Sequence, residues 1–103
     1  MKDIIQRKIS ELSELCDKHR VLRLALFGSA TTDDFNPDSS DLDFIVEFQA
    51  MAPAEHADNY FGLQEDLEHL FGMPVDLVES APIKNPYFRK AIEDTQVVLY
   101  VAA

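Results

Sequence analysis

The chain has 103 residues, of which 47% are hydrophobic, and its 9 Lys or Arg against 19 Asp or Glu give a net charge of −10. This length suits one small domain spanning residues 1 to 103 and leaves no room for a second. The negative charge repels a phosphate backbone, so it argues against direct binding of nucleic acid and favours a basic partner or an anionic ligand screened by metal ions.

The lone cysteine and the first residues indicate where the protein works. Cys16 has no second cysteine with which to pair, which fits the reducing cytoplasm. Met1 is followed by Lys2, Asp3 and an amphipathic pattern rather than by the apolar core of a signal peptide. No apolar run reaches the roughly 18 residues that a membrane span needs. We therefore expect a soluble, cytoplasmic protein that does not bind membranes.

The first predicted elements are a helix and a buried strand. Between Asp3 and about His19, apolar residues recur at three- and four-residue spacings, which is typical of an amphipathic helix. Residues 21 to 27, VLRLALF, form a nearly continuous apolar run that predicts a buried strand. The run ends at Gly28, where the missing Cβ allows a sharp turn or a close backbone approach, and Ser29 follows.

A second strand is predicted over residues 41 to 48, after an acidic loop. Side chains alternate between the two faces of a strand, so Asp41 and Asp43 should project to one side with their Cα atoms about 6.6 Å apart. Two carboxylates this close favour a bound cation, and ordinary surface acids are the alternative. One face of the strand carries Leu42, Phe44, Val46 and Phe48, and the other carries Asp41, Asp43, Ile45 and Glu47.

A long helix is predicted in the middle of the chain. Pro53 suits its first turn, and Gly72 suits its end. The apolar stripe of this helix is most simply part of the core, although a share of it could form a partner-binding patch. The stripe consists of Ala57, Tyr60, Phe61, Leu67, Leu70 and Phe71.

The last part of the chain is predicted to contain two strands and a short helix. VDLVE at residues 75 to 79 is the first strand, and its alternation puts Asp76 opposite the apolar residues on either side. Pro86 begins a helix that runs to about Asp94, and residues 97 to 101 form the last strand. Helices that alternate with strands indicate an α/β (α+β) fold, with a small mixed sheet of about four strands flanked by helices.

Three of these elements carry the residue types that nucleotidyl transfer needs. Gly28 and Ser29 follow the first strand, Asp41 and Asp43 open the second, and Asp76 lies in the third. A glycine lets backbone N–H groups approach a phosphate, a serine hydroxyl donates a further hydrogen bond, and carboxylates hold Mg²⁺. A third carboxylate can complete a metal site or take a proton from an attacking hydroxyl. If the strands are neighbours, the three aspartates can meet at one edge of the sheet.

Two other patterns that could suggest a metal site are weak. The run from Asp34 to Asp38 begins like an EF-hand loop, but its sixth and twelfth positions are Ser39 and Ile45 rather than Gly and Glu. The three histidines share no metal-ligand spacing, so we expect them at the surface. They are His19, His56 and His69.

The run GSATTDDFNPDSSDLD, the apolar FIVEF after it and the later PVDLVE resemble the minimal nucleotidyltransferases of the DNA polymerase β superfamily. The family pattern is Gly-Ser, a spacer, Asp-x-Asp and an aspartate on a later strand. Here eleven residues separate Ser29 from Asp41, one more than is usual in the family, and the extra loop residue costs little closure entropy. The closing run NPYFRKAIEDTQVVLY also resembles the end of such domains. The resemblance implies a polymerase β-like nucleotidyltransferase core.

By that resemblance, Gly28 and Ser29 would bind the nucleotide triphosphate, and Asp41 and Asp43 would hold two Mg²⁺ ions. Asp76 would be the third metal ligand and the catalytic base. The implied reaction transfers a nucleoside monophosphate, foremost AMP from ATP, to a hydroxyl and releases pyrophosphate.

The resemblance also implies a partner. Family members this short commonly act as antitoxins paired with an all-helical HEPN-domain toxin, a ribonuclease, and some inactivate it by adding AMP to a tyrosine. A basic, RNA-cleaving toxin would be attracted to so acidic a chain, so we expect a hetero-oligomer with such a toxin.

Two alternatives stay open at this point. An antitoxin could neutralise its partner by binding alone, with the fold retained and little or no catalysis. The acceptor could instead be a small molecule such as an aminoglycoside, although this chain is short for building a wall around such a substrate unless a dimer or a partner supplies it.

Overall fold

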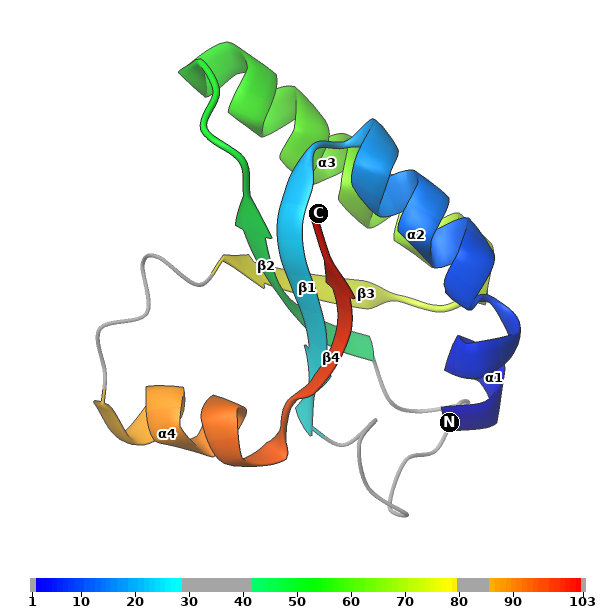
Figure 1. Ribbon diagram of the computed structural model, residues 1–103, viewed down its shortest axis with the longest axis vertical. Coiled ribbons are helices and arrows are strands. Elements are labelled where there is room, and N and C mark those ends of the chain that lie inside the picture. The colour runs from blue at the N-terminus through cyan, green and yellow to red at the C-terminus, as the bar shows by residue number, and fades with distance from the viewer. Residues whose placement is uncertain (1, 29–41, 80–85, 103) are drawn as a thin grey trace.

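A computed structural model describes residues 2–28, 42–79 and 86–102 of the chain. The four strands form one mixed sheet in the order β3-β2-β1-β4, in which β1 pairs antiparallel with β2 and β4, and β2 pairs parallel with β3 (Figure 1). The sheet confirms the predicted fold class. The elements in chain order are α1 (Lys2–Arg7), α2 (Ile9–Lys18), β1 (Val21–Phe27), β2 (Leu42–Phe48), α3 (Pro53–Phe71), β3 (Val75–Glu79), α4 (Pro86–Thr95) and β4 (Val97–Val101).

The helix predicted at the N-terminus is two helices rather than one. Lys8 has φ −111° and ψ 14°, so it interrupts the helical geometry between α1 and α2. Its Nζ donates a 2.6 Å hydrogen bond to the carbonyl oxygen of Leu70 near the end of α3. Ile5 and Leu12, one from each helix, are both buried in the same core. The prediction was wrong here because the apolar spacing continues through a bend that only the contact with α3 reveals.

The main core lies between one face of the sheet and the helices α2 and α3, which lie side by side in Figure 1. The apolar face predicted for β2 is buried in this core, and each large side chain removed from water there contributes about 1.5–3 kcal/mol. Among its fully buried members are Leu12, Leu24, Leu42, Phe44, Leu63 and Leu67.

The apolar stripe of α3 is only partly core. Leu67 and Phe71 are buried, whereas Phe61 is 64% exposed. The ring of Phe61 instead meets that of Tyr60 edge-on, with centroids 5.2 Å apart. The helix ends as predicted at Gly72, which adopts φ +66°.

His19 is buried, so its predicted surface position was wrong. It packs against α3 at Gly62, where an added Cβ would lie 2.7 Å from the His19 Cε1 atom. Its Nε2 is hydrogen-bonded to Asp66 Oδ2 at 2.7 Å, and its Nδ1 lies 3.3 Å from Asn59 Oδ1. A glycine inside a helix costs about 1 kcal/mol of propensity relative to alanine. Gly62 is needed here because the imidazole occupies the space of a side chain.

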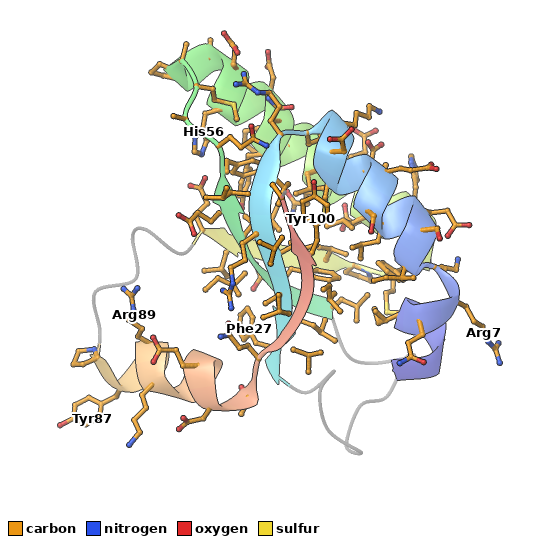
Figure 2. The ribbon with its side chains drawn as sticks, in the orientation of Figure 1. Arg7, Phe27, His56, Tyr87, Arg89 and Tyr100 are labelled. Carbon is orange, nitrogen blue, oxygen red and sulfur yellow. The ribbon has the colours of Figure 1, made fainter. Side chains whose placement is uncertain are left out.

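The opposite face of the sheet carries a smaller buried group. Ala25 and Ile45 are buried there, and Phe27, near the end of β1, packs against them (Figure 2). Helix α4 lies apart from α2 and α3 in Figure 1, and its Tyr87 projects away from the sheet and is 86% exposed (Figure 2). None of the helices in the described ranges has the length and apolar character that crossing a membrane requires.

Candidate active site

Two of the three predicted aspartates are brought together by the parallel pairing of β2 with β3. The register pairs Asp43 with Asp76, on strands that lie about 4.8 Å apart in a sheet of this kind. The residues that follow them, Phe44 and Leu77, are buried in the main core, so both aspartates face the other side of the sheet. Asp76 is exposed and Asp43 is half-buried. The result is a pair of carboxylates on one face.

Gly28 lies beside the same pair. The register of β1 with β2 puts Phe27 opposite Asp43, and Gly28 follows at the end of the strand. Gly28 has φ +74°, and a Cβ built on it would lie 2.7 Å from the Asp43 Oδ2 atom. A side chain would therefore strain the backbone and also displace the carboxylate. Glycine is required at this position for two independent reasons.

The other two predicted site residues, Ser29 and Asp41, lie outside the described residues. The described part of the site comprises Gly28, Asp43 and Asp76. Gly28 follows the end of β1, Asp43 lies in β2 and Asp76 lies in β3, and these three strands are neighbours in the sheet.

The described donors suit a hard divalent cation. Carboxylate oxygens are the protein ligands that Mg²⁺ prefers, and Asp43 and Asp76 supply them from adjacent strands. Within residues 2–28, 42–79 and 86–102, no group of three or more His, Cys, Asp or Glu is placed to hold a metal ion.

One row of side chains from α3 covers the outer edge of β3, which is the end strand of the sheet. Tyr60 Oη donates a 2.5 Å hydrogen bond to the Leu77 carbonyl oxygen. Gln64 Nε2 donates a 3.1 Å bond to the Val75 carbonyl oxygen, and the Val75 N–H donates a 3.1 Å bond to Glu68 Oε2. Residues four apart lie on one face of a helix, so this row meets the strand along its length. The row satisfies peptide groups that an edge strand would otherwise present to another chain.

Tyr60 connects this row to the acidic site. Burial raises the pKa of its hydroxyl, and the negative charges of Glu79 and Asp76 raise it further. The hydroxyl donates its hydrogen bond to the Leu77 carbonyl oxygen, beside these acids. Sequence reasoning assigned Tyr60 to the core and missed this bond, because its acceptor is a backbone atom that no side-chain pattern marks.

A pocket of about 460 Å³ opens near the end of β3, beside the first turns of α3. His56, labelled in Figure 2, contacts Glu79 Oε1 through its Nε2 at the rim of the pocket. The His56 ring packs on that of Phe48 with centroids 5.1 Å apart. Gly28, Asp43 and Asp76 are not among the described residues that line this pocket. Its lining consists of Met51, Pro53, His56, Ala57, Tyr60 and Glu79.

The chain matches the family model described as a nucleotidyltransferase domain over residues 9–99. The chain belongs to this family. A protein of Methanocaldococcus jannaschii, provisionally named a protein adenylyltransferase, is 38% identical over 96 residues, which cover 91% of this chain and 89% of the relative. A second protein of that organism with the same provisional name is 34% identical, over 85% of this chain and 94% of the relative. The chain is thus a nucleotidyltransferase enzyme.

Solved structures share the fold of this nucleotidyltransferase. One, described provisionally as a minimal nucleotidyltransferase, gives a TM-score of 0.67 at 25% identity and covers 92% of each chain. Another, described as a tri-AMPylated HEPN toxin of Shewanella oneidensis in complex with its MNT antitoxin, gives a TM-score of 0.63 at 16% identity. That match covers 94% of this chain and 72% of the other, and it is a likeness of fold alone. With the family match, these likenesses confirm the resemblance to the minimal nucleotidyltransferases of the DNA polymerase β superfamily.

Proposed function

We propose that this nucleotidyltransferase transfers AMP from ATP to a tyrosine hydroxyl of a HEPN-type ribonuclease toxin, in a magnesium-dependent reaction, and so acts as the antitoxin. The provisional name of the relatives at 38% and 34% identity supports AMP as the group transferred and a protein as the acceptor. Fold relatives described as toxin–antitoxin complexes, one of them with AMP-PNP, support a toxin partner.

The pairing of Asp43 with Asp76 beside Gly28 carries the proposal. We assign Asp41, Asp43 and Asp76 as ligands of two Mg²⁺ ions, and Gly28 with Ser29 as the binding site of the triphosphate. When bound, the ions neutralise charge that develops on the phosphates. Asp76 also serves as the catalytic base, since its exposed carboxylate is accessible to an acceptor hydroxyl.

The proposed reaction is a displacement at the α-phosphorus of ATP. The tyrosine oxygen forms a bond to that phosphorus, while the bond from phosphorus to the oxygen that bridges to the β-phosphate breaks. Pyrophosphate leaves, AMP stays on the tyrosine, and the hydroxyl proton passes to the Asp76 carboxylate. No other reactant is needed.

The charge of the chain supports a basic protein partner in a hetero-oligomer. A net charge of −10 attracts a partner that binds RNA and therefore carries positive charge. We further propose that residues 1 to 103 act as one domain in the cytoplasm. A buried cysteine with no second thiol in the sequence, Cys16, is in keeping with that compartment.

The test is transfer of label to a purified HEPN-type partner encoded beside this chain. With Mg²⁺, ATP labelled on the α-phosphate should label the partner, whereas ATP labelled on the γ-phosphate should not. Asp43→Asn and Asp76→Asn should each lower the rate by about 10² to 10⁴. Glu47→Gln is the matched control, because Glu47 lies exposed on the same face of β2 as Asp43. Transfer that persists undiminished in Asp43→Asn would refute the proposal.

A second candidate function, neutralisation by binding alone, is favoured by the surface of α3. Phe61 is 64% exposed, and Asp58 and Glu65, three residues before it and four after it, are exposed as well. An exposed aromatic side chain between acids is typical of an anchor for a basic protein surface. The two functions are separated by a toxicity assay with the double variant Asp41→Asn, Asp43→Asn. Neutralisation that survives this variant but is lost in Phe61→Ser would establish binding as the function.

A further inference from the structure

We propose that Tyr60, Gln64 and Glu68 are positioning residues for the reaction. By holding the outer edge of β3, they set the position of Asp76 relative to Asp43. The inference rests on the proposed function, in which Asp76 is the catalytic base.

The hydrogen bonds from α3 fall on the two residues that flank Asp76. The Pro74 carbonyl accepts a 3.1 Å bond from the Leu42 amide on β2. Peptide groups of successive residues point to opposite edges of a strand, so those of Asp76, two residues after Pro74, also point to β2. Those of Val75 and Leu77 point outward, and these are the groups that Glu68, Gln64 and Tyr60 bind. The backbone at Asp76 is therefore held on one edge by the sheet and on the other through both of its neighbours.

This support matters because Asp76 lies on a short strand that, among the described residues, pairs only with β2. No residue in the described ranges hydrogen-bonds its carboxylate, and the side chain is exposed, so the strand backbone has to place it. β3 has five residues and pairs with one neighbour, in the parallel manner that is slightly weaker per residue. Short edge strands open locally more readily than central ones. A misplacement of about 1 Å in a catalytic group can cost roughly 10² in rate.

The row is matched to this role by its chemistry. Tyr60 donates through its hydroxyl to the Leu77 carbonyl oxygen at 2.5 Å. Gln64 donates and Glu68 accepts at the same residue, Val75. A shift of β3 by one residue would exchange outward and inward peptide groups and break all three bonds. The row therefore selects a single register of Asp76 against Asp43.

The test compares variants that remove one polar group with variants that keep it. Tyr60→Phe removes the hydroxyl alone, and Glu68→Met removes the acceptor at similar length. Glu68→Gln keeps an acceptor oxygen, so this variant should behave like the wild type. His69→Gln, on the same helix but exposed, is the control for a change that does not face β3.

The first readout is amide hydrogen exchange, which needs no activity. Tyr60→Phe and Glu68→Met should each speed exchange of the Asp76 and Val78 amides about three- to tenfold, since one net hydrogen bond is lost. Amides of the central strand β1 should keep their rates. Unchanged exchange in β3, or an equal acceleration in β1, would overturn the inference whether or not the protein transfers AMP.

The second readout is AMP transfer to the toxin. Tyr60→Phe should lower kcat about tenfold and leave the KM for ATP unchanged, and it should have no further effect in an Asp76→Asn background. If Tyr60→Phe lowers kcat by the same factor in the Asp76→Asn background as in the wild type, Tyr60 acts other than through Asp76, and the inference is contradicted. Absence of transfer by the wild-type protein would instead count against the proposed function, and the exchange result would still decide whether the row holds β3.

Discussion

The Oδ2 atom of Asp43 lies 2.7 Å from the point that a Cβ of residue 28 would occupy. The contact joins two segments that sequence reasoning had assigned to different tasks, phosphate binding for Gly28 and metal binding for Asp43. Because the carboxylate fills the space that glycine leaves open, Gly28 and the Asp43 side chain form one structural unit. A change at either residue therefore acts on the other.

Gly28→Ala should impair catalysis more than it impairs folding. Alanine at φ +74° costs about 1–2 kcal/mol of stability, and its methyl group must also push the Asp43 carboxylate aside. Gly72→Ala is the matched control, because Gly72 has φ +66° but no atom within 4 Å of an added Cβ. Urea unfolding and AMP transfer measured on both variants should show similar losses of stability but a loss of transfer in Gly28→Ala alone. Equal transfer by the two variants would contradict the prediction.

Gly62→Ala should destabilise the protein although alanine favours a helix. The added Cβ would lie 2.7 Å from the His19 ring, and such overpacking costs about 1–3 kcal/mol, more than the roughly 1 kcal/mol gained in helix propensity. In a His19→Ala background the clash disappears, so the same change should stabilise the protein by up to about 1 kcal/mol. The midpoints of thermal unfolding of the wild type, Gly62→Ala, His19→Ala and the double variant measure this change of sign. A stabilising effect in both backgrounds would show that α2 moves freely against α3.

The ion pair between α2 and α3 should give stability a dependence on acid pH. The hydrogen bond from His19 lowers the pKa of Asp66 below its ordinary 3.8, with help from Lys18. A carboxyl whose folded pKa is lowered contributes stability above its unfolded pKa and loses it as the pH falls through the folded value. Asp66→Asn should therefore reduce the free energy of unfolding at pH 7 by about 1–3 kcal/mol. The difference in free energy of unfolding between the wild type and Asp66→Asn should shrink below about pH 3.8. Denaturant titrations at a series of pH values measure this difference, and a difference that stays constant with pH would contradict the prediction.

Cys16 should be unreactive in the folded protein. Burial raises the pKa of its thiol to about 12, from an ordinary 9.0. At pH 8 the thiolate fraction is then about 10³ lower than in the unfolded chain, and the thiolate is the reactive form. Labelling with a thiol-specific disulfide reagent should be slow in buffer and complete within minutes in denaturant. Fast labelling of the folded protein would mean that α2 opens readily.

Much of the fold could be predicted because its signals are local. The strands at residues 21–27, 75–79 and 97–101 have the predicted bounds, since each is an apolar or alternating run between clear breaks. The N-terminal helix was the exception. Its apolar spacing continues through Lys8, where the helix breaks and the side chain donates a hydrogen bond to Leu70, a residue 62 positions away in the chain.

The sequence by itself determined most of the elements, the apolar faces of β2 and β3 and the candidate residues of the site, because periodicity and residue chemistry are properties of short segments. Only the tertiary structure decided that Asp43 lies beside Asp76, that Gly62 makes room for His19, and that Tyr60 serves the edge of β3. Each of these relations depends on strand register or on the distance between a helix and its neighbour. Such quantities arise when segments far apart in the chain pack together, and no local pattern encodes them.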